Sequence, residues 1–260
     1  MKTISSASGG SREDSAGRIG GNDVRWRELL RAAQAPYRGS GLFAWFFARG
    51  KLGLDPVFRS LLELGLIRPQ AHIVDIGCGQ GLLASLLAAV DRCSADGRWP
   101  ADWPPAPVGA RYTGLELMPR DVERAAAALS GLPSAPSFVC ADMVDAALPD
   151  CDVVVILDVL HYVDHAAQQR VLGRVFDALA GGGRLLLRVG DQHAERGFRA
   201  SQWTDRVVTA VRGHSVPPTF CRPLADWTSL LREIGFADVR GLPMSRGTPF
   251  ANVLLVADKA

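Results

Sequence analysis

Short apolar runs alternate along the chain with longer segments that carry a single apolar stripe. The runs predict strands at residues 110–116, 137–140, 152–157 and 184–189, and one more begins at Ile73. The striped segments predict helices at 82–90, 121–129 and 224–234, and another after Asp164 that Gly181, Gly182 and Gly183 terminate. Two last strands are expected at 237–241 and 251–256, joined by a long hairpin connection. This alternation predicts an α/β fold with a doubly wound, mostly parallel sheet of seven strands, covered on both faces.

The N-terminal part of the chain follows a different pattern. Its first residues are rich in Ser and Gly and cannot bury much apolar surface, which predicts disorder. A helix is expected at 22–35, where Pro36 ends it, and a second helix begins with Asp55 as its N-cap. The predicted divisions are a disordered tail at 1–22, a helical lid at 23–66, and a main domain at 67–260 with insertions at 92–109 and 191–223.

The first apolar run closes on a turn with glycines at alternate positions. Gly77, Gly79 and Gly81 follow Asp75, and the next apolar stripe begins at once with Leu82. Because glycine has no Cβ, the chain can turn sharply here and a ligand can approach the backbone. The following helix begins with unpaired N–H groups, which suits a polar cofactor; a tight turn without a ligand is the alternative. A dinucleotide fingerprint would place its third glycine three residues after the second, where this chain has Leu82.

Polar residues also stand where the later strands end, at the edge where such sheets bind ligands. Glu116 could accept both hydroxyls of a ribose, or be a surface Glu that caps the next helix. Asp142, followed by Met143, could accept a hydrogen bond from an adenine amino group, or form a turn. The fourth strand ends at Asp158 and His161, a carboxylate and an imidazole that a core strand does not need.

Taken in order, these strand ends resemble class I S-adenosylmethionine-dependent methyltransferases over residues 70 to 190. The resemblance implies a Rossmann-like fold and S-adenosylmethionine as the cofactor. The residues it assigns to the cofactor are Asp75, Gly77, Cys78, Gly79 and Gly81 in the loop, Glu116 at the ribose, Asp142 and Met143 at the adenine, and Asp158 and Val159 at the methionine ammonium, with Leu117 as a further contact. The spacing from Asp75 to Glu116 is longer than is usual in the family, because a Pro- and Trp-rich insertion intervenes.

Methyl transfer from a sulfonium is a direct displacement, so the protein must align the reacting atoms and keep water out. A base helps when the acceptor is a weak acid. His161 is the candidate base because histidine titrates near neutral pH, and His193 is a second candidate. The alternative for His161 is that it packs or caps the next helix.

Acceptor choice is expected in the aromatic segment 37–51 and in the insertion 191–223. Residues 37–59 carry four basic residues against one acidic residue, and residues 188–222 carry six arginines against three acidic residues. This basic rim favours a hydrophobic acceptor with an anionic group, free or delivered on an acidic carrier protein. Tyr37 and Arg49 are further expected to close over the cofactor carboxylate. The alternative is that the aromatic residues pack the helices on the sheet and the arginines are solvated.

Composition narrows the function classes. The formal net charge of +2 and the absence of a concentrated basic stripe argue against nucleic-acid binding. The five cysteines form no C-x-x-C pair, so neither a metal site nor a complete disulfide framework is expected. No apolar run suggests a signal peptide or membrane insertion, which predicts a cytoplasmic protein.

The leading hypothesis is therefore a methyltransferase acting on a small, aromatic or lipid- or polyketide-like acceptor. Two alternatives stay open. One is a non-catalytic S-adenosylmethionine-binding sensor or assembly protein. The other is an NAD(P)-dependent reductase, which the glycine spacing disfavours.

Overall fold

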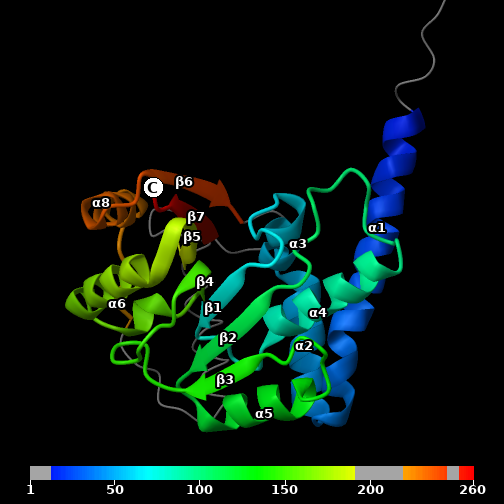
Figure 1. Ribbon diagram of the computed structural model, residues 1–260, viewed down its shortest axis with the longest axis horizontal. Helices are drawn as coiled ribbons and strands as arrows, with labels where there is room; N and C mark the ends of the chain where they lie inside the picture. The colour runs from blue at the N-terminus through cyan, green and yellow to red at the C-terminus, as the bar shows by residue number, and fades with distance from the viewer. Residues whose placement is uncertain (1–12, 191–218, 245–251) are drawn as a thin grey trace, which may run out of the picture.

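A sheet of seven strands forms the centre of the computed structural model, which describes residues 13–190, 219–244 and 252–260. The strand order is β3-β2-β1-β4-β5-β7-β6 (Figure 1). The strands β1 to β5 run parallel, and β7 is antiparallel to both of its neighbours. Their bounds are β1 His72–Ile76, β2 Arg111–Glu116, β3 Ser137–Cys140, β4 Cys151–Leu157, β5 Leu179–Gly190, β6 Asp238–Pro243 and β7 Asn252–Asp258. The predicted doubly wound, mostly parallel sheet is confirmed.

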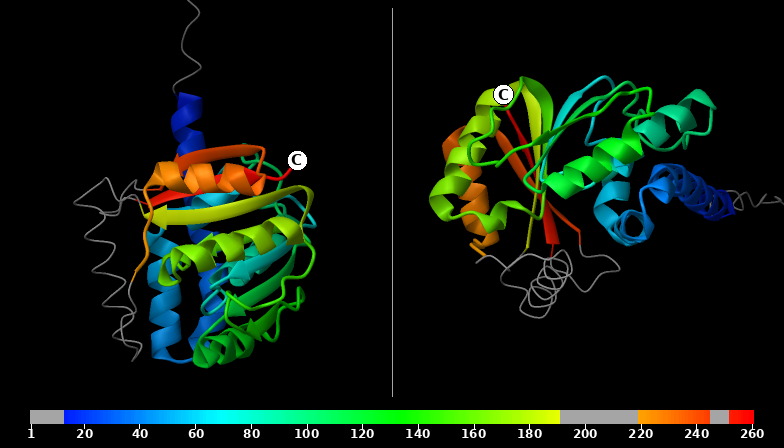
Figure 2. Two further views of the ribbon diagram at one scale, coloured as in Figure 1. Left: turned by 90° about the vertical axis from the view of Figure 1, so that its left-hand side faces the viewer. Right: turned by 90° about the horizontal axis from the view of Figure 1, so that it is seen from below.

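Helices cover both faces of this sheet (Figure 2). One face carries α6 and α8, whose apolar residues share a buried cluster with Val74, Val154 and Leu187. The other face carries the N-terminal helices together with α4 and α5, around a second cluster. The helix bounds are α1 Glu13–Gln34, η1 Ala35–Gly39, α2 Leu42–Leu54, α3 Pro56–Glu63, α4 Leu82–Ala95, α5 Pro119–Leu129, η2 Leu160–Tyr162, α6 His165–Ala178 and α8 Leu224–Ile234. In the described part of the chain, no helix has the length and apolar character needed to cross a membrane.

Two local expectations need correction. The helix expected from residue 22 begins at Glu13, so residues 13–22 of the predicted disordered tail are helical, and residues 1–12 lie outside the described residues. The glycines expected to terminate α6 lie instead inside β5, because α6 already ends at Ala178. Gly182 and Gly183 there exchange backbone hydrogen bonds with Lys259. A Cβ on Gly183 would stand 2.7 Å from the Ala180 oxygen, so this part of the strand needs glycine.

The Pro- and Trp-rich insertion at 92–109 packs against α1. Trp103 lies 6.4 Å from Trp26 of α1 and 5.4 Å from Trp99, measured between ring centroids. The Asn22 amide donates to both carboxylate oxygens of Asp102, at 2.9 and 2.7 Å. Aromatic pairs of this kind add about 0.5 to 1.5 kcal/mol each beyond their buried area. The insertion therefore helps to hold α1 on the main domain.

Candidate active site

The loop between β1 and α4 has all of its glycines in the left-handed region. The φ angles are 76° at Gly77, 55° at Gly79 and 72° at Gly81. A Cβ at Gly77 would stand 2.6 Å from Val159, and one at Gly81 would stand 2.8 Å from Phe138. At Gly79 a Cβ would meet nothing within 4 Å. Gly77 and Gly81 thus allow close packing inside the protein, whereas Gly79 borders open space that a ligand can enter.

Glu116 lies beside this open position. Its Oε2 accepts a hydrogen bond from the Gly79 amide at 2.9 Å, and its Oε1 accepts one from the Met118 amide at 3.0 Å. The long spacing from Asp75 does not displace it, because β2 pairs directly with β1 and brings Leu115 opposite Ile76. The Leu115 oxygen also accepts from the amides of Gly77 and Cys78, at 2.8 and 3.0 Å. A cofactor would therefore contact Gly77 and Cys78 through atoms other than their amides.

Two residues predicted to bind cofactor have partners inside the protein. Asp75 is buried, and its Oδ2 accepts from the Tyr112 hydroxyl at 2.6 Å. Burial raises the pKa of Asp75 to about 7, although the Tyr112 hydrogen bond opposes the shift. Tyr37 is also fully buried, and its hydroxyl donates to the backbone oxygen of Gln80 at 2.8 Å. Both side chains therefore support the glycine loop from within the core.

The side chains of Arg49 and Cys78, which the sequence also assigns to the cofactor, contact other parts of the protein. The exposed Arg49 places its guanidinium carbon 4.9 Å from the ring centroid of Trp45, so Tyr37 and Arg49 have separate partners. The Cys78 thiol is buried against β2, where a Cβ on Gly114 would stand 2.6 Å from its sulfur. Burial raises the pKa of Cys78, which keeps the thiol protonated.

The ends of β2 and β3 expose apolar side chains next to Glu116. Leu117 is 57% exposed and Val139 is 47% exposed, which is unusual for apolar residues beside a core strand. Asp142 follows β3, and its Oδ1 accepts from the Val144 amide at 2.8 Å. This is the turn that the sequence allowed as an alternative, with the carboxylate exposed and Met143 half-buried after it. The site thus has an apolar flank ending in an exposed carboxylate.

The segment after β4 closes the other flank. Asp158 has a φ of 59°, a conformation that few non-glycine residues adopt, and Val159 after it packs on Gly77. His161 lies in η2, and its ring centroid is 4.2 Å from that of Tyr162. Burial lowers the pKa of His161 despite the opposing charge of Asp158, so the imidazole is neutral at neutral pH. His193, the other predicted base, lies outside the described residues.

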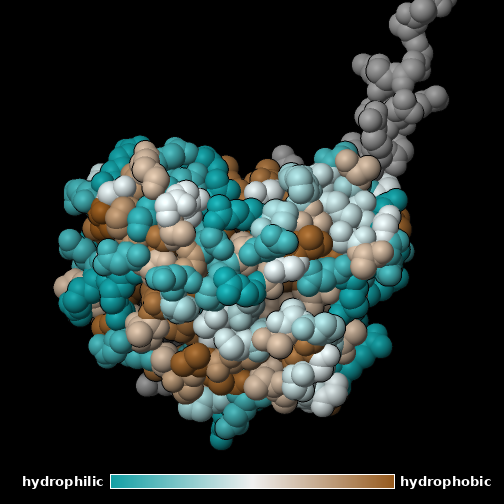
Figure 3. All heavy atoms as spheres, in the orientation of Figure 1, coloured by the Kyte–Doolittle hydropathy of each residue, from teal (hydrophilic) through white to brown (hydrophobic). Residues whose placement is uncertain are grey.

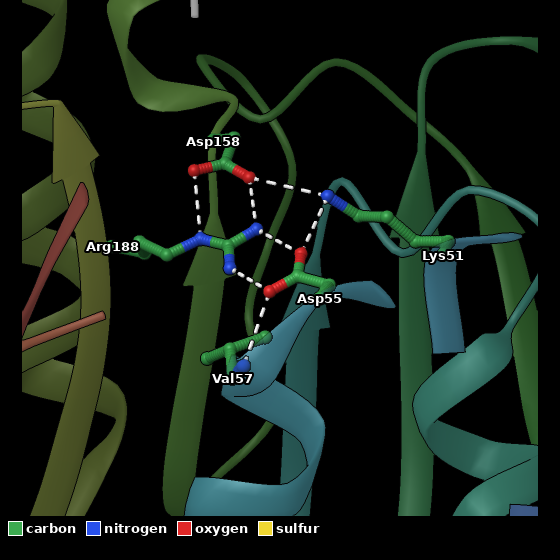
Figure 4. Close-up of polar contacts among 5 residues, drawn as sticks. All are labelled: Lys51, Asp55, Val57, Asp158 and Arg188. Carbon is green, nitrogen blue, oxygen red and sulfur yellow. Dashed lines mark hydrogen bonds and ion pairs between the residues drawn. The ribbon is translucent and has the colours of Figure 1, made fainter. Parts of the chain in front are cut away.

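A network of four charged side chains joins this segment to the N-terminal helices (Figure 4). Arg188 of β5 is buried between Asp55 and Asp158. Its Nη2 lies 2.7 Å from Asp55 Oδ2, and its Nε lies 2.8 Å from Asp158 Oδ1. Lys51 reaches both carboxylates, at 2.8 Å to Asp55 and 3.5 Å to Asp158. Asp55 also caps α3, as predicted, by accepting from the Val57 amide at 3.1 Å.

The network keeps both carboxylates charged. Burial alone would raise the pKa of Asp55 and of Asp158, but the nearby charges of Arg188 and Lys51 outweigh it and lower both. Arg188 shows the converse, because its two carboxylate partners raise its pKa against the effect of burial. Two cations and two anions balance, which makes it possible to bury the guanidinium.

Sequence reasoning missed this network. Arg188 is one of the six arginines that the sequence assigns to the basic rim or, alternatively, to the solvated surface, and the structure corrects both interpretations because only 1% of its side chain is exposed. The sequence pattern does indicate a buried charge, because Arg188 interrupts the apolar run formed by Leu185-Leu186-Leu187 and Val189. A charge inside an otherwise apolar strand requires a buried partner. Nothing in the sequence identified that partner as Asp55, which is distant along the chain.

The described residues contain no group of three or more His, Cys, Asp or Glu placed to hold a metal ion.

Comparisons with known proteins show which proteins this chain resembles in sequence. Carboxy-S-adenosyl-L-methionine synthase from Aeromonas salmonicida is 32% identical over 122 residues, which is 46% of this chain and 44% of that protein. The same enzyme from Aeromonas hydrophila is 31% identical over 122 residues, 46% of this chain and 43% of that protein. The chain thus spans less than half the length of these curated relatives.

Solved structures share the fold at low identity. Human N-acetylserotonin methyltransferase in complex with S-adenosylmethionine aligns with a TM-score of 0.56 and 16% identity, over 89% of this chain and 58% of that one. Magnesium protoporphyrin IX methyltransferase from Synechocystis with bound S-adenosylhomocysteine aligns with a TM-score of 0.55 and 20% identity, over 85% and 88%. A family model described as a methyltransferase domain matches residues 51–240. Because this match spans most of the chain, the protein belongs to that methyltransferase domain family, whose cofactor is S-adenosylmethionine.

Proposed function

We propose that this protein is an S-adenosylmethionine-dependent methyltransferase that transfers the methyl group directly to a small acceptor. The observation that carries the proposal is the arrangement at Gly79. Its α-carbon borders open space, and its amide is held by the Glu116 carboxylate at 2.9 Å. A loop that exposes backbone beside a fixed carboxylate suits a ligand that presents a ribose diol.

The remaining strand ends have complementary roles in this proposal. Leu117 and Val139 would cover the faces of the adenine, and Asp142 would accept from its amino group. Asp158 and Val159 would lie near the methionine half. When bound, the cofactor supplies a methyl group on a positively charged sulfur. The protein's own contribution is to orient the acceptor, exclude water and, through the neutral His161, accept a proton from it.

The exposed face of α2 supports a hydrophobic acceptor that carries an anionic group. Leu42 is 76% exposed and Phe46 is 60% exposed on this helix. Cations border the aromatic rings, since the guanidinium of Arg124 lies 5.0 Å from the ring centroid of Phe43. We propose an aromatic or lipid- or polyketide-like acceptor, either free or attached to an acidic carrier protein.

Isothermal titration with S-adenosylhomocysteine tests the cofactor site. The wild-type protein should bind it, and Glu116→Ala should weaken binding at least about tenfold, since hydrogen bonds to charged groups contribute about 1.5 to 3 kcal/mol. Glu123→Ala is the matched control, because Glu123 is exposed on α5. A wild-type protein that binds no S-adenosylhomocysteine would refute the proposal.

Transfer of a tritiated methyl group to acceptors in a fractionated small-molecule extract tests catalysis. Labelled product that depends on the wild-type protein supports the methyltransferase. Cofactor binding without any transfer would instead support a sensor or assembly protein. Tight binding of NADPH in a fluorescence titration would favour the reductase.

A further inference from the structure

Arg188 connects two carboxylates from distant parts of the chain. Asp55 lies at the junction of α2 and α3, and Asp158 lies one residue beyond the end of β4. The β4–β5 register places Leu157 opposite Arg188, so the guanidinium reaches the strand ends where ligands bind in this class of sheet. Only 1% of the Arg188 side chain is exposed, and Figure 4 shows both carboxylates directed at it.

The Asp158 side of this contact leads to the glycine loop. Asp158 holds a left-handed backbone conformation, which costs a non-glycine residue roughly 1 kcal/mol or more. The ion pair with Arg188 stabilises Asp158 in that conformation. Val159 follows directly and lies so close to Gly77 that no Cβ would fit between them. Moving Asp158 would therefore move the wall against which the glycine loop packs.

The Asp55 side leads to the N-terminal helices. Asp55 caps α3, and Lys51 of α2, one helical turn earlier in the chain, pairs with it at 2.8 Å. Lys51 also lies 3.5 Å from Asp158, so the junction of α2 and α3 contacts both Arg188 of β5 and the segment after β4. The same α2 carries the exposed aromatic face described above.

We propose that Arg188 is a positioning residue that ties the N-terminal helices to the segment after β4. One buried cation then fixes the proposed acceptor side and the proposed cofactor side relative to one another. What each side binds rests on the proposed function, but the tie itself rests on the contacts alone. Removing one carboxylate partner should release both segments, because the remaining buried charges are left unbalanced.

Hydrogen exchange of the ligand-free protein tests the tie. Asp55→Asn is the decisive variant, because asparagine caps a helix about as well as aspartate but cannot balance the Arg188 charge. Amides at residues 158–163 should exchange at least about tenfold faster in this variant, although the substitution is made in another element. Unchanged exchange at 158–163 would overturn the proposal.

A pair of matched arginine variants provides the second measurement. Arg184 lies four residues earlier on the same strand and pairs with both oxygens of Asp258, at 2.6 and 3.1 Å. Arg188→Lys keeps the charge but loses the planar fork, and should raise the Kd of S-adenosylhomocysteine at least about threefold at a temperature where the variant is fully folded. Arg184→Lys should leave that Kd unchanged. Equal effects of the two variants would overturn a positioning role.

The two proposals fail separately. If the wild-type protein binds no S-adenosylhomocysteine while Asp55→Asn still accelerates exchange at 158–163, the tie is supported and the proposed function is not. If binding is intact and exchange at 158–163 does not respond to Asp55→Asn, the tie is refuted and the proposed function stands.

Discussion

Val159 lies directly against the α-carbon of Gly77, so that a Cβ at Gly77 would stand 2.6 Å from the Val159 Cγ1 atom. This contact joins the loop after β1 to the segment after β4, two strands that are neighbours in the sheet. The glycine loop is thus shaped by its neighbour as well as by its own backbone freedom.

Alanine substitutions should separate the two kinds of glycine in this loop. Both Gly77→Ala and Gly79→Ala place a side chain at positive φ, which costs roughly 1 to 2 kcal/mol. Gly77→Ala adds the clash with Val159, worth a further 1 to 3 kcal/mol or so. Gly79→Ala should therefore unfold at the higher urea concentration of the two, yet still weaken S-adenosylhomocysteine binding because its methyl group enters the open space. Equal stability of the two variants would contradict this account.

The stability of the protein should depend on pH through Asp75. Its folded pKa of about 7 lies above the ordinary value of 3.8, so the folded state binds the proton more tightly. The stabilisation is complete below about pH 4 and is lost as the pH rises through 7, by up to about 4 kcal/mol. Chemical unfolding from pH 4.5 to 8 measures it, and Asp75→Asn should flatten the decline.

The carboxylates of Asp55 and Asp158 should make stability fall as the pH is lowered, in a range below that of Asp75. Asp55 and Asp158 have lowered pKa values, so the stability that they contribute is present above about pH 4 and is lost below it.

Asp145→Asn, at an exposed turn residue, serves as the control for Asp75→Asn. A decline between pH 4.5 and 8 that survives in Asp75→Asn would show that another group is responsible.

Tyr37→Phe should destabilise the glycine loop without changing the packing of the ring. The substitution removes the hydroxyl that donates to the Gln80 oxygen at 2.8 Å and leaves that buried carbonyl without this donor. A loss of about 1 to 3 kcal/mol in the free energy of unfolding is expected. Hydrogen exchange at residues 79–82 should accelerate in parallel. Unchanged values for both quantities would show that Tyr37 acts only through its ring.

His161 should control the rate of methyl transfer if it acts as a base. Because burial lowers its pKa below the ordinary 6.5, kcat/KM should rise with pH and reach a plateau below neutrality. His161→Asn should lower kcat by roughly 10² to 10⁴ and abolish this dependence. His165→Asn, at an exposed position of α6, is the control. A full rate in His161→Asn would assign the residue to packing.

The sequence by itself determined the alternation of strands and helices in the main domain. Short apolar runs predicted each strand, and apolar stripes predicted α4, α5, α6 and α8; the strand Ser137–Cys140 and the helix Leu224–Ile234 have the predicted bounds. The left-handed turns were predictable because only glycine adopts them readily, at Gly77, Gly79 and Gly81. The helix caps Asp55 and Asp164 were predictable because a capping side chain bonds amides only two or three residues away along the chain.

Only the tertiary structure decided which of the candidate side chains have partners inside the core. Asp75 and Tyr37 looked like cofactor residues, but Asp75 pairs with Tyr112 and Tyr37 with Gln80, inside the core. Arg188 and Asp55 meet only because β5 and the α2–α3 junction lie together in the fold. Local patterns report interactions across a few residues, whereas a buried charge is balanced by whichever partner the packed chain brings within about 3 Å.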